Sequence, residues 1–326
     1  MKMKKSFSAA MVLAAVISMA AEPVRPKVSE PELAGIVSIA PYADVSAKVT
    51  AFGLLIGNPV VPALLLASLQ QSAVVTYGRF RTDVPLYLAS YVVAPEKSDE
   101  VVVFPSVDRI SRMALAHPGS ERVSKDVLHL IPSEKSPYDR YAVFEGVFTA
   151  FASSEALARR ALADSKPSAG EKLSLVRAML RRAGVRSVCQ ASQRAGITNV
   201  ANVVKGFARL DLTLDLDDQG LTLTVAGARA DGVADATFKE NLQRELHQIF
   251  DVIGGGDSKL CPSVAVDVKE GGDVNGEVRI TKEQLKELGK DFNSFVTKQM
   301  SGALSGEEEG KNKNIKKGAK GKVHKK

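Results

Sequence analysis

The chain has 326 residues, of which 45% are hydrophobic and 25% charged, and its formal net charge is +7. This length is typical of one large or two medium-sized domains, and the hydrophobic content excludes a chain that is disordered throughout. Trp is absent and aromatic residues make up only 6%, which disfavours a carbohydrate-binding face of stacked rings. Without the three Lys of the N-terminal head and the eight of the C-terminal tail, residues 6–310 carry a charge of −4. This mildly acidic body does not favour nucleic acid as a partner.

The first 21 residues have the form of a secretory signal peptide. A basic head with Lys2, Lys4 and Lys5 precedes an uncharged, mostly apolar run, and the small residues Ala20 and Ala21 offer a cleavage site. No Cys follows this site, so a bacterial lipid anchor is not indicated. We therefore expect a periplasmic or secreted protein. Residues 22–34 contain three prolines and mixed charge and are expected to form a flexible leader.

A first α+β unit is predicted over residues 35–165. Arg81-Thr82-Asp83 separates two of its strands as a hairpin signal, and Ser153 or Ser154 is placed to cap its last helix. The patterns predict strands over 36–39, 73–80, 84–93, 101–104, 127–131, 138–145 and 147–152, and helices over 42–57, 60–71, 106–116 and 155–163.

The apolar stretch 49–69 has two interpretations. It contains no charged residue and is long enough to cross a bilayer. However, Gly57-Asn58-Pro59 interrupts it and Gln70-Gln71 follows it, which two short buried helices explain more simply. Both interpretations remain open at this point.

A second α+β unit is predicted over residues 171–304, after a linker over 166–170. Thr237–Glu240 and Thr281–Gln284 have the pattern of capping boxes that begin helices. The patterns predict further helices over 171–183 and 190–204, a hairpin of strands over 210–216 and 221–225, and strands over 264–268 and 278–280. Element order is similar in both halves, which predicts a duplicated unit. Hairpin-joined strands predict an α+β fold of two similar, mostly antiparallel units with helices packed on one face.

Two segments carry a resemblance to known proteins. Residues 147–157, Val-Phe-Thr-Ala-Phe-Ala-Ser-Ser-Glu-Ala-Leu, form a strand leading into a Ser-capped helix, and residues 210–223 form the hairpin described above. Together they resemble exported bacterial envelope proteins of unknown function that are built from two α+β repeats. The resemblance implies an envelope location and supplies no catalytic residues.

The two cysteines, Cys189 and Cys261, are predicted to form a disulfide. An exported chain passes into an oxidising space, where such a bridge persists. It would close a long loop and contribute about 4 kcal/mol in the chain-entropy treatment. The alternative is a pair of separate buried thiols.

No catalytic, cofactor-binding or metal site is predicted. A Gly-x-Ser-x-Gly nucleophile elbow and a His-Glu-x-x-His zinc motif are both absent from the sequence. Residues 215–220 resemble the start of a calcium loop, but Ala226 stands where the bidentate Glu is needed. The glycines at 254–256 do not have the spacing of a phosphate-binding loop.

The C-terminal segment 305–326 is predicted to be a disordered, Lys-rich tail. Its Lys residues are expected to attract an anionic membrane surface or envelope polysaccharide. They are Lys311, Lys313, Lys316, Lys317, Lys320, Lys322, Lys325 and Lys326.

These features favour an exported, non-enzymatic envelope protein with a binding or scaffolding role and a basic tether. Two alternatives remain. One is a hydrolase whose carboxylate pair lies outside any recognisable motif. The other is a periplasmic chaperone or lipid carrier that uses the apolar region 49–69.

Overall fold

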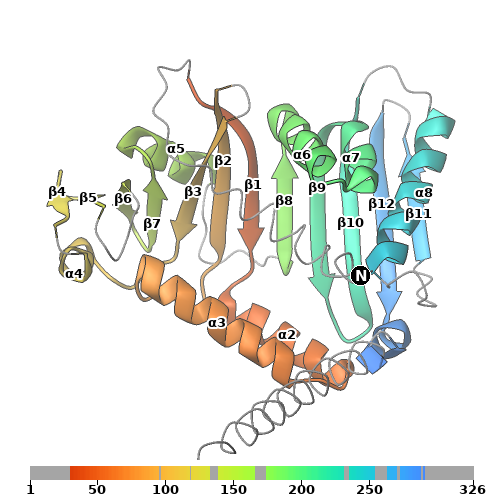
Figure 1. The fold of residues 1–326 in the computed structure, drawn as a ribbon, viewed down its shortest axis with the longest axis horizontal. Helices are drawn as coiled ribbons and strands as arrows, with labels where there is room; N and C mark the ends of the chain where they lie inside the picture. The colour runs from red at the N-terminus through yellow and green to blue at the C-terminus, as the bar shows by residue number, and fades with distance from the viewer. Residues whose placement is uncertain are drawn as a thin grey trace, which may run out of the picture.

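The chain forms one twelve-stranded antiparallel sheet with helices packed around it (Figure 1). This computed structural model describes residues 30–94, 97–117, 119–132, 139–165, 174–230, 235–253, 263–269, 272–287 and 289–290. The strands are β1 (Glu32–Ile39), β2 (Leu86–Ala94), β3 (Lys97–Phe104), β4 (Glu121–Arg122), β5 (Val127–Leu130), β6 (Arg140–Glu145), β7 (Phe148–Ala152), β8 (Val176–Leu180), β9 (Phe207–Leu216), β10 (Gly220–Arg229), β11 (Ser263–Val268) and β12 (Asp273–Thr281). The helices are α2 (Tyr42–Leu55), α3 (Val60–Tyr77), α4 (Ile110–Ala116), α5 (Glu155–Ser165), α6 (Arg182–Arg194), α7 (Thr198–Lys205) and α8 (Asp235–Ile253).

Strand β1 joins the two halves of the sheet. The spatial order is β11-β12-β10-β9-β8-β1-β2-β3-β7-β6-β5-β4, so Ile39 of β1 stands opposite Leu86 on one side and Val176 on the other. Helix α6 also approaches β1 closely, because a Cβ added to Gly184 would lie 2.2 Å from the carbonyl oxygen of Ala34. The sheet is therefore continuous across the two units predicted from the sequence. Their separate identity and their origin as a repeat stay predictions.

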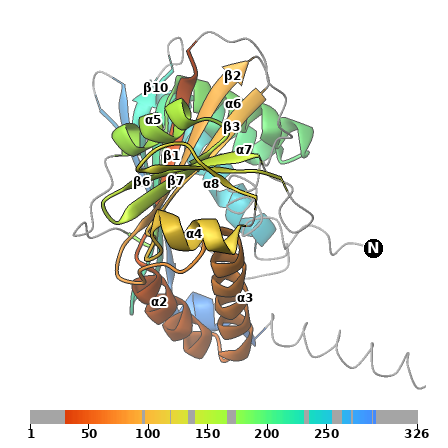
Figure 2. The ribbon, with the colours of Figure 1, turned by 90° about the vertical axis from the view of Figure 1, so that its left-hand side faces the viewer.

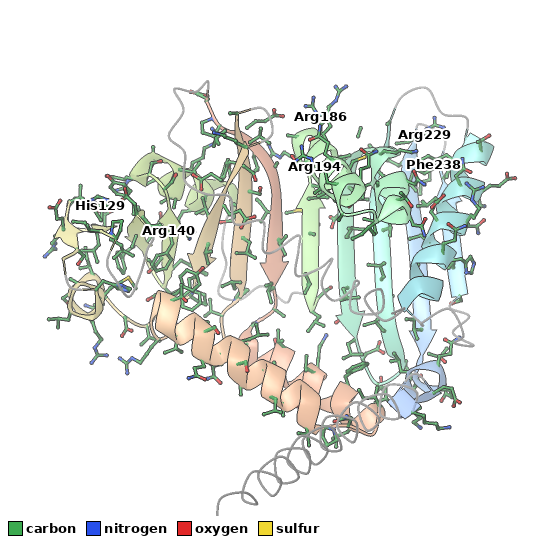
Figure 3. All side chains as sticks on the ribbon, in the orientation of Figure 1. His129, Arg140, Arg186, Arg194, Arg229 and Phe238 are labelled. Atoms are coloured by element: carbon green, nitrogen blue, oxygen red, sulfur yellow. The ribbon has the colours of Figure 1, made fainter. Side chains whose placement is uncertain are left out.

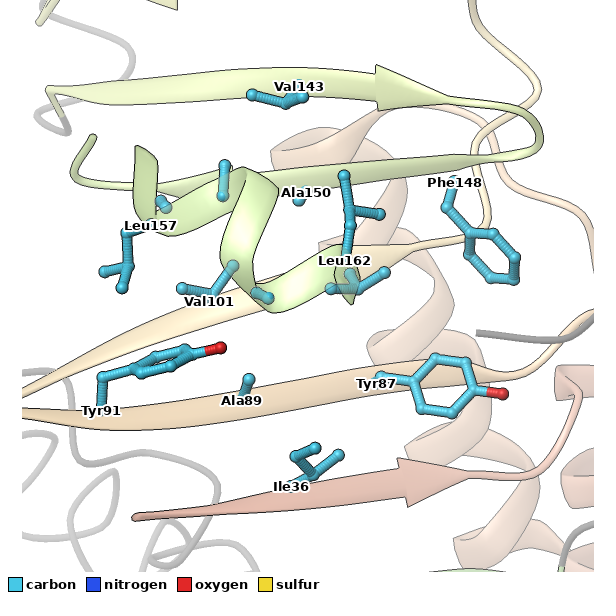
Figure 4. Packing of buried hydrophobic residues seen from close by; sticks show 14 of the residues in the cluster. Ile36, Tyr87, Ala89, Tyr91, Val101, Val143, Phe148, Ala150, Leu157 and Leu162 are labelled. Carbon is cyan, nitrogen blue, oxygen red and sulfur yellow. The ribbon is translucent and has the colours of Figure 1, made fainter. Parts of the chain in front are cut away.

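The two halves of the sheet bury cores on opposite faces. Side chains alternate along a strand, so Ile36 and Val37 of β1 point to opposite sides. On the Ile36 side, α5 covers the first half over a core that includes Tyr91, Val101 and Ala150 (Figure 4). On the Val37 side, α6, α7 and α8 cover the second half, over the inward-facing leucines of β9 and β10. Figure 2 accordingly shows α5 and the α6–α7 pair on either side of the central strands.

A third core lies on the Val37 side of the first half, beneath α4 and the C-terminal end of α3. It buries Phe104, Met113 and Phe151. The ring of Tyr77, the last residue of α3, packs against Phe104 and Phe151 with centroid distances of 5.2 and 5.1 Å. The first half of the sheet is thus covered on both faces.

The Ile36 side of the second half carries mainly polar side chains. Arg177 of β8 donates hydrogen bonds of 2.6 to 3.2 Å to the carboxylate of Asp211 on β9. Met179 lies on this side as well, opposite Asp211 in the β8–β9 register, with 38% of its surface exposed. This alternation of apolar and polar residues is typical of an antiparallel sheet with one face toward solvent.

Helices α2 and α3 form a hairpin along one end of the strands. It connects β1 to β2 and extends beneath both halves of the sheet (Figure 1). The rings of Tyr42, at the start of α2, and Phe80, just after α3, meet edge to face at 5.6 Å. Phe52 and Leu55 at the other end of α2 pack against the core of the second half.

The predicted α+β class with a mostly antiparallel sheet is confirmed. Two predicted elements are wrong. Residues 73–77 continue α3 instead of starting a strand, and residues 176–180, expected within a helix, form β8. β1 begins at Glu32, inside the stretch expected to be a leader. The predicted signal peptide, the linker over 166–170 and the tail lie outside the described residues.

Candidate functional site

Large apolar side chains of the α2–α3 hairpin are open to solvent. We call this set the apolar surface, and α3, which carries most of it, runs along the lower end of the sheet (Figure 3). Its members and their exposed fractions are Leu54 66%, Val60 62%, Leu64 62%, Leu69 66% and Val74 39%. Full burial of one such side chain contributes roughly 1.5–3 kcal/mol relative to leaving it in water. Clustered apolar exposure of this kind marks an interaction surface.

Helix α3 has the composition of a buried helix, but several of its apolar side chains are exposed. Its 18 residues include no charged side chain, and apolar residues occur all round its axis. Among its described side chains, Leu66 is buried, and Ala73 and Tyr77 contact the third core. The two helices expected over 49–69 are therefore present, but several of the described side chains of α3 are exposed.

Glycine and proline determine where the hairpin turns. Gly57 has a φ of +70°, in the left-handed region that favours glycine, and Pro59 directly precedes α3. Gly78 ends α3 with a φ of +85°. In the described part of the chain no helix is both long and apolar enough to span a bilayer.

An ion pair and apolar contacts hold α2 against the second half of the sheet. Lys48 of α2 pairs with Asp215 of β9. Burial opposes ionisation of Asp215, but the hydrogen bonds from Lys48 and from the Leu216 amide outweigh it and keep the pKa of Asp215 below its usual value. These contacts fix α2, and with it the hairpin that carries the apolar surface, against the second half of the sheet.

Three arginines border the apolar surface at the C-terminal end of α3. We call Arg79, Arg109 and Arg112 the arginine rim. Asp108 accepts hydrogen bonds from the backbone and guanidinium of Arg79 at 2.9 to 3.2 Å, and one from Arg112 at 3.5 Å. One carboxylate thus orients two cations, and the rim keeps a net positive charge. Leu115 of α4, which is 82% exposed, extends the apolar area beside it.

The described chain ends at the opposite end of the hairpin, beside the α2–α3 turn. A Cβ added to Gly289 would lie 2.4 Å from the carbonyl oxygen of Ile56, so the C-terminal helical segment lies directly on the end of α2. Leu285 of the same segment is buried in the core of the second half.

Of the site residues predicted from the sequence, Cys189 alone is among the described residues. Cys189 is half-buried on α6, and its Sγ lies 3.7 Å from the carbonyl oxygen of Ala201. Cys261 and the tail lysines fall outside the described residues, so the disulfide and the tether stay predictions. Sequence reasoning found the uncharged stretch 49–69, but no sequence signal identified which of its side chains are exposed or that an arginine rim borders it.

One carboxyl group in the first half of the sheet, that of Glu100 on β3, has a strongly raised pKa. Burial raises the pKa of Glu100 to about 7; Arg140 opposes this and Asp99 adds to it. Asp99 and Glu100 are consecutive residues of β3, so their side chains point to opposite faces of the sheet. They do not converge as the acid pair of the hydrolase alternative requires.

A histidine–carboxylate pair lies at the edge of the sheet away from α2. His129 Nε2 is 2.6 Å from Asp139 Oδ1, and the imidazole stacks on the Tyr141 ring at 4.5 Å (His129 is labelled in Figure 3). The stacked ring and the carboxylate hold the imidazole in place at the sheet edge. Within the described ranges, no group of three or more His, Cys, Asp or Glu is arranged to hold a metal ion.

Comparison with known proteins gives only distant structural neighbours. No family model matches the chain. No curated protein matches it either. Crystal form I of the treponemal protein TP0453 is 9% identical, with a TM-score of 0.41 over 79% of this chain and 92% of that one. Crystal form III is 10% identical, with a TM-score of 0.43 over 82% of this chain and 98% of that one. Similarity at this level assigns neither a family nor a function.

Proposed function

We propose that this chain is an exported, non-enzymatic envelope protein with a binding or scaffolding role, held at an anionic surface of the envelope by its Lys-rich tail. The signal-peptide form of residues 1–21 supports export. Eight Lys without an acidic residue over 311–326 support attraction to lipid headgroups or anionic polysaccharide, each Lys contributing about 1 kcal/mol near an anionic membrane.

The observation that supports this proposal is the coexistence of a Lys-rich tail in the sequence and exposed apolar side chains on the α2–α3 hairpin. The tail lysines begin at Lys311, 22 residues beyond Gly289, which packs on Ile56 at the end of α2. Electrostatic attraction and apolar contact are two different kinds of attachment signal. Stable surface attachment in general needs two such signals.

Export is tested by N-terminal sequencing of the protein recovered from the producing cells. Cleavage after Ala20 or Ala21 predicts a mature chain that begins at Ala21 or Glu22. Recovery of a protein that still begins at Met1 in the cytoplasmic fraction overturns the export part of the proposal.

The tether is tested with the mature chain and vesicles that contain phosphatidylglycerol. Deletion of residues 311–326 is expected to weaken adsorption by more than about tenfold, because it removes eight cations. Binding of the intact protein should also fall as salt rises, since the Debye length shortens from about 30 Å at 0.01 M to about 8 Å at 0.15 M. A variant with all eight Lys replaced by Gln keeps the length and should behave like the deletion. Equal binding by the intact and truncated proteins overturns the tether.

A further inference from the structure

We propose that the apolar surface of the α2–α3 hairpin docks on a lipid bilayer, with α3 lying in the membrane interface and its exposed Val60, Leu64 and Val74 side chains entering the acyl region. This inference rests on the proposed attachment to the envelope and deepens it. It selects a lipid membrane over polysaccharide as the partner, and it assigns the contact to residues of the folded body.

The first support is the chemistry of α3. A helix of 18 residues is about 27 Å long, and this one offers no charge anywhere along that length. Val60, Leu64 and Val74 lie within one stripe at helical spacing, and Leu69 lies outside it. The polar residues of α3 are Ser, Gln, Thr and Tyr, all uncharged, and the interface tolerates them. The side chains that hold the helix to the body, Leu66 and Tyr77, are on the sheet side and stay in place when the other side docks.

The second support is the distribution of charge around the apolar surface. The arginine rim lies at the C-terminal end of α3, an otherwise uncharged helix. Cations beside exposed apolar side chains are complementary to a plane of anionic headgroups. Docking of the apolar surface brings the arginine rim to that plane.

A second copy of this chain is a less favourable occupant. A two-fold symmetric contact through α3 places the helices antiparallel, so the arginine rim of one copy meets the uncharged N-terminal turn of α3 in the other and gains no opposite charge. An anionic bilayer supplies opposite charge to the arginine rim.

The test uses a single introduced tryptophan as a depth probe, because the chain has none. Leu64→Trp is made in the full mature protein, which is mixed with phosphatidylcholine vesicles with and without phosphatidylglycerol. Docking predicts a blue shift of the indole emission and quenching by lipids brominated in the acyl chain, with anionic vesicles only. Met179→Trp is the matched control. It places the probe at another exposed apolar position, on the polar face of the sheet, and should show neither effect.

A second pair of variants tests docking without introducing a bulky side chain. Val60→Ser with Leu64→Ser should weaken binding to anionic vesicles by about tenfold or more with an unchanged melting temperature, whereas Met179→Ser should leave binding unaltered. No blue shift, together with full binding of the double Ser variant, overturns docking through α3. If binding still depends on the tail in that case, the proposed attachment stands and only this inference fails. A blue shift that depends on protein concentration without lipid identifies a second copy as the occupant and also overturns it.

Discussion

Gly289 lies directly against Ile56, at the point where α2 ends and the chain turns toward α3. A Cβ at position 289 would lie 2.4 Å from the Ile56 carbonyl oxygen and 2.7 Å from its Cα. Only a residue without a side chain permits this approach. The contact joins the last described residues of the chain to the end of α2.

Gly289→Ala is expected to loosen this contact. The added methyl group meets backbone atoms, which cannot move aside, and overpacking of this kind costs about 1–3 kcal/mol. Each kcal/mol corresponds to a fall of roughly 2–4 °C in the melting temperature of a domain of this size. Gly276→Ala on β12 is the matched control, because the nearest atom to its added Cβ is 3.6 Å away. Thermal unfolding followed by circular dichroism measures both, and equal melting temperatures would contradict the contact.

Glu100 is expected to make stability fall as the pH rises. Its folded pKa of about 7 lies above the ordinary value of 4.5, so the folded state binds the extra proton between these two values. The unfolded state gives up its proton first, and the free energy of unfolding therefore decreases from pH 4.5 to pH 7 and levels off above it.

Glu100→Gln removes the charge and should abolish this decrease. At pH 8 the variant should be more stable than the parent by about 1–2 kcal/mol; this is below the full value of about 1.36 kcal/mol per pKa unit because the group is partly exposed. Urea unfolding at about pH 4.5, 6 and 8 provides the comparison. A parent protein that gains stability over this range, relative to the variant, refutes the assignment.

Cys189 and Cys261 are expected to be bonded in the exported protein. Thiol labelling of the folded, unreduced chain should find no free thiol, and labelling after denaturation and reduction should find both. The bridge requires Cα atoms within about 7 Å of each other. Two thiols that react before reduction would show that the cysteines are separate.

Local sequence signals predicted several elements of the fold correctly. The capping box at Thr281 is reciprocal, as expected: the Thr281 amide donates to Gln284 Oε1 at 2.8 Å and the Gln284 amide donates to Thr281 Oγ1 at 3.3 Å. The hairpin of alternating leucines forms with Leu216 opposite Leu221. These elements were predictable because their patterns are short and complete within one segment.

Strand β8, which pairs with β1 at the centre of the sheet, was not predictable from such local signals. Strand β8 alternates Val176, Ala178 and Leu180 with Arg177 and Met179, but the flanking residues are compatible with a helix. Its strand conformation depends on pairing with β1 and β9, which are distant in the sequence. Tertiary pairing overrides local propensity here. In α3 the residues near Val74 are β-branched, which favours a strand, yet they continue the helix up to Gly78.

From the sequence, the candidate site was predictable only as an uncharged, apolar stretch. The sequence marks 49–69 as uncharged and interrupted at Gly57, which correctly predicts two helices. It does not determine which side of α3 faces the sheet. That side is set by contacts of Tyr77 with Phe104 of β3 and Phe151 of β7.

The most direct test of the account combines the tail and the apolar surface in one cycle of variants. The intact mature protein, the 311–326 deletion, the Val60→Ser and Leu64→Ser double variant, and the combination of all three changes are compared for binding to vesicles containing phosphatidylglycerol. Two independent contacts predict that each change weakens binding, that their free-energy effects add, and that the combined variant no longer sediments with vesicles. A combined variant that binds as tightly as the intact protein would contradict the account.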